Sequence, residues 1–402
     1  MTLYVHLLEE TSIKLWGLTS RGRLRRQLGH EGIDHWTQDL AEVPNDSRVL
    51  LLRGDYLYDP RILAGLAKGR RLLLTSDDGG TPIAAVATAT EAPGVASLLT
   101  GAAGARSPES LQRVTPAQLS DGFDSKLRRL NPASLVRVTH ANRPELERQL
   151  FDNAYKGITD LVTKWLWPTP ARWVTHWCAR LGITPNQVTS LSWVLALLTI
   201  VLFVQGELAW GLLTGWTMTF LDTVDGKLAR VTVNYSRFGD LFDHLLDLIH
   251  PPFWYLAWGL GLTAFTPGIP GLTLGVGIGL IFAAYIGGRV VEGAFRHILA
   301  APFSIFAWRR VDSYSRLITA RRNPSLILLT ASALAGRPDL GLVAVAGWTL
   351  VSSLFLLARL AVAWGRQQRG QSLRSWLTEL TYPPKEQSFA VRWFAGLTHG
   401  VN

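Results

Sequence analysis

The second half of this 402-residue chain contains three long runs without a charged side chain, and these runs limit what the chain can fold into. They cover residues 181–206, 248–288 and 340–358. A helix needs about 20 mostly apolar residues to cross the hydrocarbon core of a bilayer. The runs therefore favour membrane-spanning helices over the alternative, a buried helical core in a soluble protein.

The run at 248–288 is interrupted by Pro267-Gly268-Ile269-Pro270, which predicts two helices joined by a turn. Shorter charge-free runs at 208–221 and 323–336 add further candidate spans. The sequence thus predicts an all-α polytopic membrane domain, preceded by a soluble α/β domain. Its six expected transmembrane helices cover about 186–205, 208–223, 238–262, 271–292, 323–337 and 340–364.

Basic residues gather in the connections expected on one side of the membrane. The connection 293–322 contains Arg296, Arg309 and Arg310 among its six arginines, and the tail after residue 364 is also basic. Basic loops stay cytoplasmic, which predicts an integral protein of the cell (inner) membrane with both termini in the cytoplasm. The net charge of +10 is then a topology signal and an attraction to anionic lipid, without a nucleic-acid partner.

The sequence predicts four segments. Residues 1–150 form a soluble cytoplasmic α/β domain, because apolar runs such as 2–7, 48–53 and 70–75 indicate strands between helical patterns. Residues 151–182 interleave tryptophans with basic side chains, which is typical of an amphipathic helix lying in the membrane interface. A soluble linker helix with core tryptophans is the alternative. The six-helix domain covers 183–364, and a cytoplasmic tail covers 365–402.

Residues 220–250 carry the most informative pattern in the chain, a set of aspartates interleaved with small residues. The pattern reads Asp222-x-x-Asp225-Gly226-x-x-Ala229-Arg230 and, after eight residues, Gly239-x-x-x-Asp243-x-x-x-Asp247. Spacings of three and four place the members of each half on one face of a helix. Two neighbouring helices would therefore present four carboxylates to one cavity at the cytoplasmic end of the membrane domain.

Four clustered carboxylates raise one another's pKa unless cations neutralise them. Hard oxygen ligands suit Mg²⁺ or Mn²⁺, and two such ions suit a displacement at phosphorus. The small residues leave room for a base or a diphosphate, and Arg230 offers a forked set of donors to phosphate oxygens. Two other interpretations are solvated helix ends, which conflict with the apolar surroundings, and the ion relay of a transporter.

Residues 222–247 resemble the signature of the CDP-alcohol phosphotransferase (CDP-alcohol phosphatidyltransferase) family, with all eight fixed positions present. Thr184-Pro185-Asn186-Gln187-Val188-Thr189 resembles the segment that opens the family's first membrane helix, and the resemblance covers about 156–364. It implies that an acceptor hydroxyl attacks the β-phosphorus of a CDP-alcohol donor such as CDP-diacylglycerol. CMP leaves and a phosphodiester forms, as in phospholipid biosynthesis.

The resemblance also implies roles for single residues. The ligands of two divalent ions, Mg²⁺ or Mn²⁺, would be Asp222, Asp225, Asp243 and Asp247, with Asp247 also acting as the general base. The CDP part of the donor would be held by Asp222, Gly226, Ala229, Arg230, Gly239 and Asp243. Family members are commonly homodimers, so a homodimer in contact with membrane lipid is expected. Outside the signature, we expect Asp240 to be a solvated or capping residue and His250 to be structural.

Arginines near the same end of the membrane domain are candidates for binding the acceptor. They are Arg289, Arg316, Arg321 and Arg322. In relatives that use a phosphorylated acceptor, such as inositol phosphate or glycerol phosphate, basic residues in this region hold its phosphate, and the resemblance implies that role here. The alternative is that these arginines only anchor a basic cytoplasmic loop.

The N-terminal domain weakly resembles a sugar-nucleotide cytidylyltransferase, through Gly17-Leu18-Thr19-Ser20-Arg21 and Arg53-Gly54-Asp55. The first segment lacks one glycine of that family's loop and no Lys follows it, which predicts a degenerate domain. Asp55 follows a buried strand, where metal or nucleotide ligands often lie, although Gly-Asp is also ordinary turn chemistry there. Three alternatives to the transferase therefore stay open: a bifunctional cytidylyltransferase and CDP-inositol-type transferase, a non-catalytic membrane scaffold, and an ion-coupled carrier.

Overall fold

The computed structural model describes residues 2–76, 80–104, 108–120, 123–124, 127–235, 237–263, 271–380 and 388–395. It does not describe the side chains of residues 237, 238, 240, 242–244, 246, 247, 263 and 271–273. The chain divides into two compact units. The α/β unit comprises Met1–Asp124, Asn131–Asn153 and Val231–Asn234. The helical unit comprises Ser125–Leu130, Ala154–Arg230 and Tyr235–Asn402.

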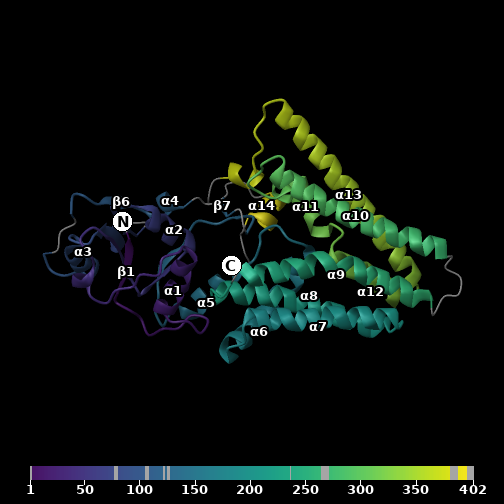
Figure 1. The fold of residues 1–402 in the computed structure, drawn as a ribbon, viewed down its shortest axis with the longest axis horizontal. Coiled ribbons are helices and arrows are strands. Elements are labelled where there is room, and N and C mark those ends of the chain that lie inside the picture. The colour runs from purple at the N-terminus through teal and green to yellow at the C-terminus, as the bar shows by residue number, and fades with distance from the viewer. Residues whose placement is uncertain are drawn as a thin grey trace. The chain divides into compact units, whose positions relative to one another are not determined.

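A five-stranded sheet forms the centre of the α/β unit (Figure 1). Its strands follow the order β1-β2-β5-β4-β6, in which β5 runs antiparallel to both of its neighbours and the other pairs are parallel. The strands span Leu3–Leu8 (β1), Arg48–Arg53 (β2), Leu72–Thr75 (β4), Pro82–Thr88 (β5) and Gln112–Val114 (β6). The expected α/β class is confirmed, and the three predicted strands correspond to β1, β2 and β4.

Helices cover both faces of this sheet, which explains why β2 is apolar at every position between its terminal arginines. Successive side chains of a strand point to opposite faces, and here Leu50 and Leu52 join the buried cluster that contains side chains of α1 (Ser20–His30) and α2 (Pro60–Lys68). Val49 and Leu51 join the cluster of α3 (Ala92–Leu99) on the other face. The remaining elements of this unit are η1 (Leu40–Glu42), β3 (Tyr56–Tyr58), α4 (Pro116–Leu119), β7 (Phe123–Asp124), β9 (Leu135–Arg137) and α5 (Arg143–Asp152), with β3 antiparallel to β9.

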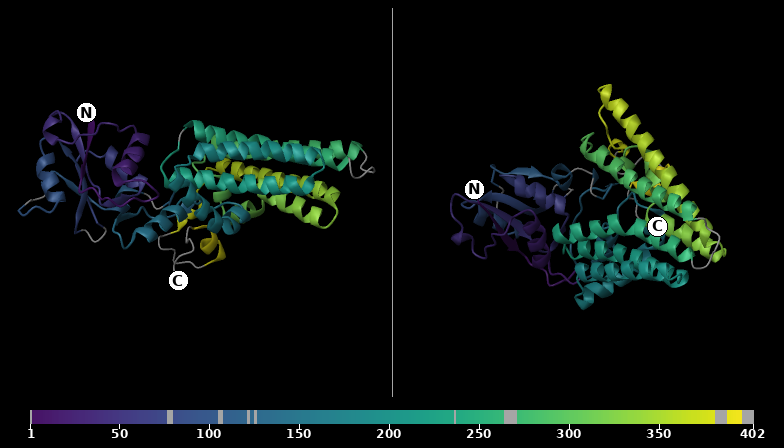
Figure 2. Two further views of the ribbon diagram at one scale, coloured as in Figure 1. Left: turned by 90° about the horizontal axis from the view of Figure 1, so that it is seen from below. Right: turned by 45° about the vertical axis from the view of Figure 1, so that its right-hand side comes forward.

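The helical unit is a bundle of long helices with short elements at its ends (Figures 1 and 2). Its long helices are α7 (Pro185–Val204), α8 (Leu208–Val231), α9 (Arg237–Thr263), α10 (Gly271–His297), α12 (Arg322–Leu334) and α13 (Pro338–Gln368). Its shorter elements are β8 (Arg129–Leu130), η2 (Val162–Leu166), α6 (Pro168–Leu181), η3 (Ile305–Ala307), α11 (Arg310–Ile318), η4 (Trp376–Glu379) and α14 (Phe389–Phe394). Within the bundle α7 packs along α9, and α10 and α12 pack along α13.

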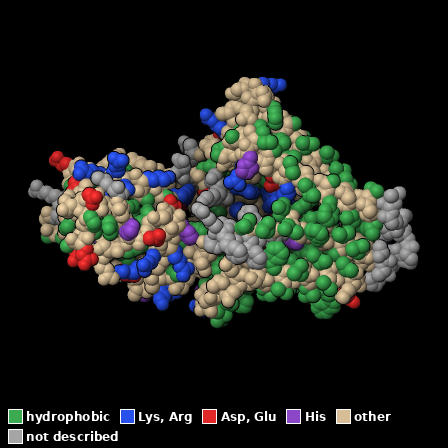
Figure 3. Space-filling view, viewed as in Figure 1, with side chains coloured by type: hydrophobic (Ala, Val, Ile, Leu, Met, Phe, Trp, Pro, Cys, Tyr) green, Lys and Arg blue, Asp and Glu red, His purple; other side chains and the backbone are tan. Residues whose placement is uncertain are grey.

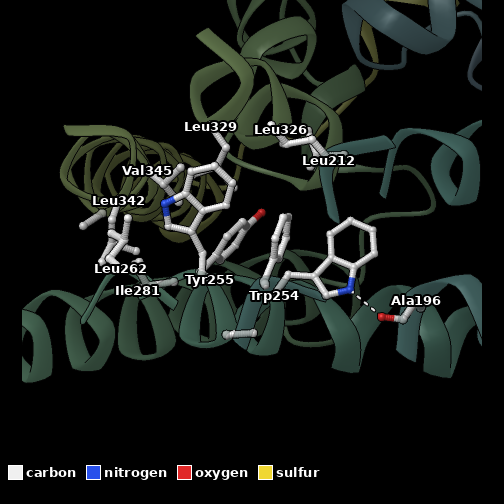
Figure 4. Close-up of a cluster of buried hydrophobic side chains, with 14 of the residues drawn as sticks. Ala196, Leu212, Trp254, Tyr255, Leu262, Ile281, Leu326, Leu329, Leu342 and Val345 are labelled. Atoms are coloured by element: carbon white, nitrogen blue, oxygen red, sulfur yellow. Dashed lines mark hydrogen bonds between the residues drawn. The ribbon is translucent and has the colours of Figure 1, made fainter. Parts of the chain in front are cut away.

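Aromatic side chains of α9 fill the core of the bundle and are anchored by hydrogen bonds. The indole of Trp254 is fully buried and donates to the carbonyl of Ala196 on α7 at 3.0 Å (Figure 4). The indole of Trp258 donates to the Pro338 carbonyl at the start of α13, also at 3.0 Å. Gly261 permits the close approach of the two helices, because a Cβ there would lie 1.9 Å from the Phe203 carbonyl oxygen. The C-terminal ends of α7 and α9 therefore pack closely, with the Phe203 backbone against Gly261.

Three helices of the described chain are long and apolar enough to cross a membrane: Pro185–Val204, Leu274–His297 and Pro338–Gln368. Apolar side chains cover much of the face of the helical unit that Figure 3 shows, as expected of an integral membrane protein. The six-span expectation is not confirmed. α12 contains 13 residues and is only about 20 Å long, less than the hydrocarbon thickness. α8 and α9 carry the charged signature.

Exposed aromatic residues lie on α6, the helix within the expected interfacial segment. Trp173 and Trp177 are 67% and 46% exposed, whereas Ala171 and Cys178 are buried. Gly182 ends the helix with a φ of +72°, and Thr184 then begins α7 with a reciprocal cap to Gln187. The helix therefore has one apolar face against the protein and one face of indoles turned outward.

Candidate active site

The signature occupies the adjoining ends of α8 and α9. Asp222 and Asp225 lie on successive turns of α8, and Gly239 lies in the first turn of α9. Asp243 and Asp247 lie further along α9, but their side chains and that of Asp240 fall outside the described residues.

Asp225 is buried within the helical unit and is held from the neighbouring helix α7. Its side chain is 4% exposed, and Oδ2 accepts a hydrogen bond from the hydroxyl of Thr189 at 2.6 Å. The same hydroxyl lies 3.1 Å from the Pro185 carbonyl, one turn earlier. Thr189 is the last residue of the segment that resembles the family's first membrane helix, but the sequence alone gave its hydroxyl no role. The structure makes Thr189 the residue that orients Asp225.

Asp222 pairs with Arg322 at the start of α12. The guanidinium donates to both carboxylate oxygens, at 3.1 Å for Nη1 to Oδ1, and the two side chains are 13% and 14% exposed. A fork-to-fork pair of this kind fixes both groups and compensates the charge of the carboxylate. Arg322 was expected among the acceptor-binding residues, but in the structure it pairs with Asp222 of the signature.

Arg230 folds back along α8 toward the small residues of the signature. Its Nη1 donates to the carbonyl of Gly226 at 3.0 Å and to that of Ala154 at 3.2 Å. A Cβ at position 226 would lie 3.4 Å from the same nitrogen, at ordinary van der Waals distance. Ala229, the other small residue of this half, directly precedes Arg230 and is partly exposed. The structure therefore brings Arg230 to Gly226, two of the CDP-binding candidates of α8.

Lys227 lies within the signature region, but no sequence pattern predicted a role for it. It is 6% exposed, and its ammonium lies 3.8 Å from the centre of the Tyr155 ring. A buried cation over an aromatic face is a stabilising arrangement. His250, which we expected to be structural, is 5% exposed and packs against the Trp254 ring, with 4.6 Å between the ring centroids.

The other candidate acceptor residues form a basic cluster around Glu292. Arg289 and Arg321 line one pocket with Glu292, and Arg321 donates to both oxygens of that carboxylate. Arg289 also donates to the Tyr285 hydroxyl at 3.1 Å. Arg316 and Arg321 both stack on Phe306, at 5.5 and 5.6 Å from the ring centre. Three of the four predicted arginines are therefore neighbours.

Arg316 is the most deeply placed of these arginines. The residue is only 8% exposed. Within the described part of the chain, its Nε and Nη1 have no hydrogen-bond partner. Burial, and then the positive charge of Arg321, lower its pKa to about 9, against the opposing effect of Asp160. Arg128, from a segment expected in the N-terminal domain, belongs to the same cluster, and burial with Arg321 lowers its pKa to about 10. Such donors suit an anion.

The chemistry of the aspartate set fits a hard divalent cation. Two carboxylates, one held by a hydroxyl and one by a guanidinium, lie on one face of α8, and oxygen donors of this kind are those that Mg²⁺ and Mn²⁺ prefer. Among the described side chains, no three His, Cys, Asp or Glu residues lie together as a metal site. That set lacks Asp243 and Asp247, the two ligands expected from α9.

In the α/β unit, Asp55 lies where the sequence placed it, just after β2, but it is engaged by arginines. The carboxylate accepts from Arg53 at 2.8 and 3.0 Å and from Arg137 at 2.9 Å, and the residue is 9% exposed. Gly17 lies in a tight turn with a φ of +77°, and the Thr19 hydroxyl caps α1. Both segments therefore have structural partners within this unit.

Comparison with known proteins agrees with the position of this site. Residues 182–364 match the CDP-alcohol phosphatidyltransferase family. An archaetidylinositol phosphate synthase of Pyrococcus horikoshii is 39% identical over 70 residues, which make up 17% of this chain and 37% of that protein. A phosphatidylinositol phosphate synthase of Mycobacteroides abscessus is 34% identical over 94 residues, 21% of this chain and 42% of that protein.

The chain thus matches less than half the length of these curated relatives. The family match covers the helices α7 to α13, and the signature aspartates of α8 and α9 lie within it. The expectation of a membrane phosphotransferase domain is confirmed at this level. Residues 182–364 of this chain match the CDP-alcohol phosphatidyltransferase family, and they contain the complete aspartate signature.

Proposed function

We propose that the helical unit transfers the phosphatidyl group of a CDP-linked lipid, such as CDP-diacylglycerol, to the hydroxyl of a phosphorylated alcohol of the inositol phosphate type. CMP is released and a phosphodiester forms. The observation that carries the proposal is the pair of signature carboxylates on α8, the buried Asp225 and the partly buried Asp222, which are oriented by Thr189 and Arg322 within the matched domain. The names of the two relatives, an archaetidylinositol phosphate synthase and a phosphatidylinositol phosphate synthase, support the choice of acceptor.

Each group in this proposal has a separate task. Divalent ions held by the four aspartates would stabilise negative charge on the diphosphate and on the CMP leaving group. Arg230, beside Gly226, is placed to bind phosphate oxygens of the donor, and Asp247 takes the proton of the attacking hydroxyl. With the basic tail and the 293–322 connection in the cytoplasm, this chemistry takes place at the cytoplasmic side.

The basic cluster supports a phosphorylated acceptor over a neutral one. Arg316 has buried donors without hydrogen-bond partners among the described residues, and a phosphate monoester would satisfy them. A neutral polyol would leave these charged donors poorly compensated. The cytidylyltransferase alternative is less well supported, because Asp55 is already bound by two arginines.

The test is acceptor-dependent release of CMP by the purified full-length protein, with CDP-diacylglycerol and Mg²⁺ or Mn²⁺. We expect activity with inositol phosphate, little with inositol, and loss of activity in Asp247→Asn or with a chelator. Asp339→Asn removes a carboxylate at the start of α13 that pairs with Arg337, and it should leave the rate unchanged. Equal rates with inositol and inositol phosphate would refute the choice of acceptor.

A second variant tests the basic cluster. Arg316→Gln should raise the KM for inositol phosphate about 10- to 100-fold, because hydrogen bonds between charged groups contribute roughly 1.5–3 kcal/mol each. The KM for the CDP-lipid should not change. Arg374→Gln, an exposed arginine outside the cluster, is the matched control. An unchanged KM for the acceptor in Arg316→Gln would remove this residue from the acceptor site.

A further inference from the structure

The connection between the two signature helices is held by the α/β unit. α8 ends at Val231 and α9 begins at Arg237, and the first residues of the connection, Val231–Asn234, cluster with the α/β unit. Val231 and Val233 are 1% and 4% exposed. A connection between two helices normally runs over the surface, where it is mobile and poorly packed. In this connection two of the first three residues, Val231 and Val233, are instead buried.

Two arginines of α1 bind the backbone of this connection. Nη2 of Arg23 donates to the Val231 carbonyl at 2.8 Å and to the Leu15 carbonyl at 3.0 Å. Nη1 of Arg26 donates to the Thr232 carbonyl at 2.7 Å. The last carbonyls of a helix have no partner within the helix and carry the negative end of its dipole, so cationic donors suit them.

Arg23 is buried, and its burial disfavours the charged form of the guanidinium. The residue is 5% exposed, and burial, followed by the charge of Arg26, lowers its pKa to about 10, with Glu147 acting in the opposite direction. It therefore remains charged at neutral pH. Glu147 also accepts from the Trp16 backbone amide at 3.1 Å, which holds the turn that presents the Leu15 carbonyl. The buried Arg23 therefore links the Leu15 carbonyl of the α/β unit to the Val231 carbonyl of the connection.

The connection contains a strained backbone conformation at Val233. Val233 has a φ of +48°, in the left-handed region that β-branched residues almost never enter. Such backbone strain persists where the surrounding structure overdetermines it, and it gathers at functional sites. Here the bonds from Arg23 and Arg26 lie on the two residues directly before Val233.

We propose that Arg23 is a positioning residue for the transferase site, and that the α/β unit acts through it as a brace on the turn that joins the signature helices. The turn leads into α9, the helix that carries Gly239, Asp243 and Asp247, so we expect its position to affect how this half of the signature meets the carboxylates of α8. The inference rests on the proposed function for its effect on catalysis. It gives the α/β unit a role that needs no nucleotide chemistry of its own.

Three variants of the full-length protein test this brace. Arg23→Met removes the donors and keeps an apolar stem. Arg25→Met removes the same charge from an exposed position of α1, and Gln27→Met alters a buried polar residue one turn from Arg23 that does not contact the connection. The first readout is hydrogen exchange of the backbone amides at 231–235. The second is CMP release, with kcat and the KM of each substrate determined separately.

In Arg23→Met we expect amide exchange at 231–235 to quicken about tenfold or more, since a hydrogen bond from a charged donor contributes about a factor of ten. We expect kcat to fall about tenfold with little change in the KM of either substrate. Arg25→Met and Gln27→Met should match the wild type at 231–235 and in kcat. Unchanged exchange at 231–235 in Arg23→Met would overturn the brace, and an equal loss of kcat in Gln27→Met would reduce Arg23 to a fold-stabilising residue.

The two readouts separate this inference from the proposed function. Hydrogen exchange needs no substrate, so a wild-type protein that releases no CMP would refute the transferase while exchange still decides the brace. A wild-type protein that is active, with faster exchange but full kcat in Arg23→Met, would refute the positioning role alone.

Discussion

Replacing Thr189 by valine isolates the hydrogen bond that orients Asp225. The two side chains have nearly the same shape, so the change removes a hydroxyl from a residue that is 5% exposed and leaves the packing of α7 against α8 intact. The lost bond is short, at 2.6 Å, and its acceptor is a buried carboxylate. Thr189→Val therefore leaves Asp225 both less well oriented and less well solvated.

The size of the effect follows from the charge of the acceptor. A hydrogen bond to a charged group contributes about 1.5–3 kcal/mol, and each 1.4 kcal/mol is a factor of ten. Groups that orient metal ligands typically change metal affinity or activity about 10- to 100-fold when removed. We therefore expect Thr189→Val to raise the concentration of Mg²⁺ or Mn²⁺ needed for half-maximal CMP release by 10- to 100-fold.

The assay is a metal titration of the initial rate of CMP release at fixed donor and acceptor. Thr189→Ser keeps the hydroxyl and should titrate close to the wild type. Thr199→Val removes a hydroxyl from a fully buried threonine of the same helix, whose partners are the Leu195 carbonyl and Thr214, and should also titrate normally. If Thr189→Val and Thr199→Val give the same metal dependence, the orienting role of Thr189 is refuted.

Two further changes test the stability of the helical unit. Burial opposes ionisation of Asp160, but Arg316 and hydrogen bonds from Thr163 outweigh it and hold its pKa below the usual value. The ionised carboxylate therefore stabilises the fold at neutral pH, and this stabilisation is lost as the pH falls below about 4. Asp160→Asn should lower the unfolding temperature at pH 7, and its difference from the wild type should shrink in acid, as thermal unfolding in detergent would show. A difference in unfolding temperature that does not depend on pH would contradict this. Gly261→Ala should cost about 1–3 kcal/mol or more because its Cβ meets a carbonyl oxygen at 1.9 Å, whereas Gly287→Ala, with open space around it, should be neutral in the same unfolding measurement.

Local patterns in the sequence predicted the elements that depend on local physics. The apolar run at 48–53 became β2 because a strand buried on both faces needs no alternation. The first membrane helix, expected from residue 186, begins at Pro185 because Thr184 and Gln187 form a capping box. The aspartate spacing likewise placed Asp222 and Asp225 on one face of a single helix.

The contacts that complete the site depend on packing between segments far apart in the chain. Asp222 and Arg322 are 100 residues apart in sequence, and no periodicity links them. The sequence grouped Arg322 with the acceptor residues because it stands beside Arg321, whereas the start of α12 directs the two side chains to different carboxylates. The sequence also could not predict that Val231–Asn234 belongs to the α/β unit. The arginine that binds this segment donates to a backbone carbonyl, and every residue has such a carbonyl.

The adjacent arginines at the start of α12 have a consequence for the order of events in the site. Arg321 pairs with Glu292 in the basic cluster, and Arg322 pairs with Asp222 in the signature. One peptide unit joins them, so a shift of the first turn of α12 changes both ion pairs together. If a bound group displaces either guanidinium, we expect occupancy at one carboxylate to be linked to occupancy at the other, and linkage of this kind is reciprocal. The two substrates of the proposed reaction would sense each other through the backbone of a single helical turn.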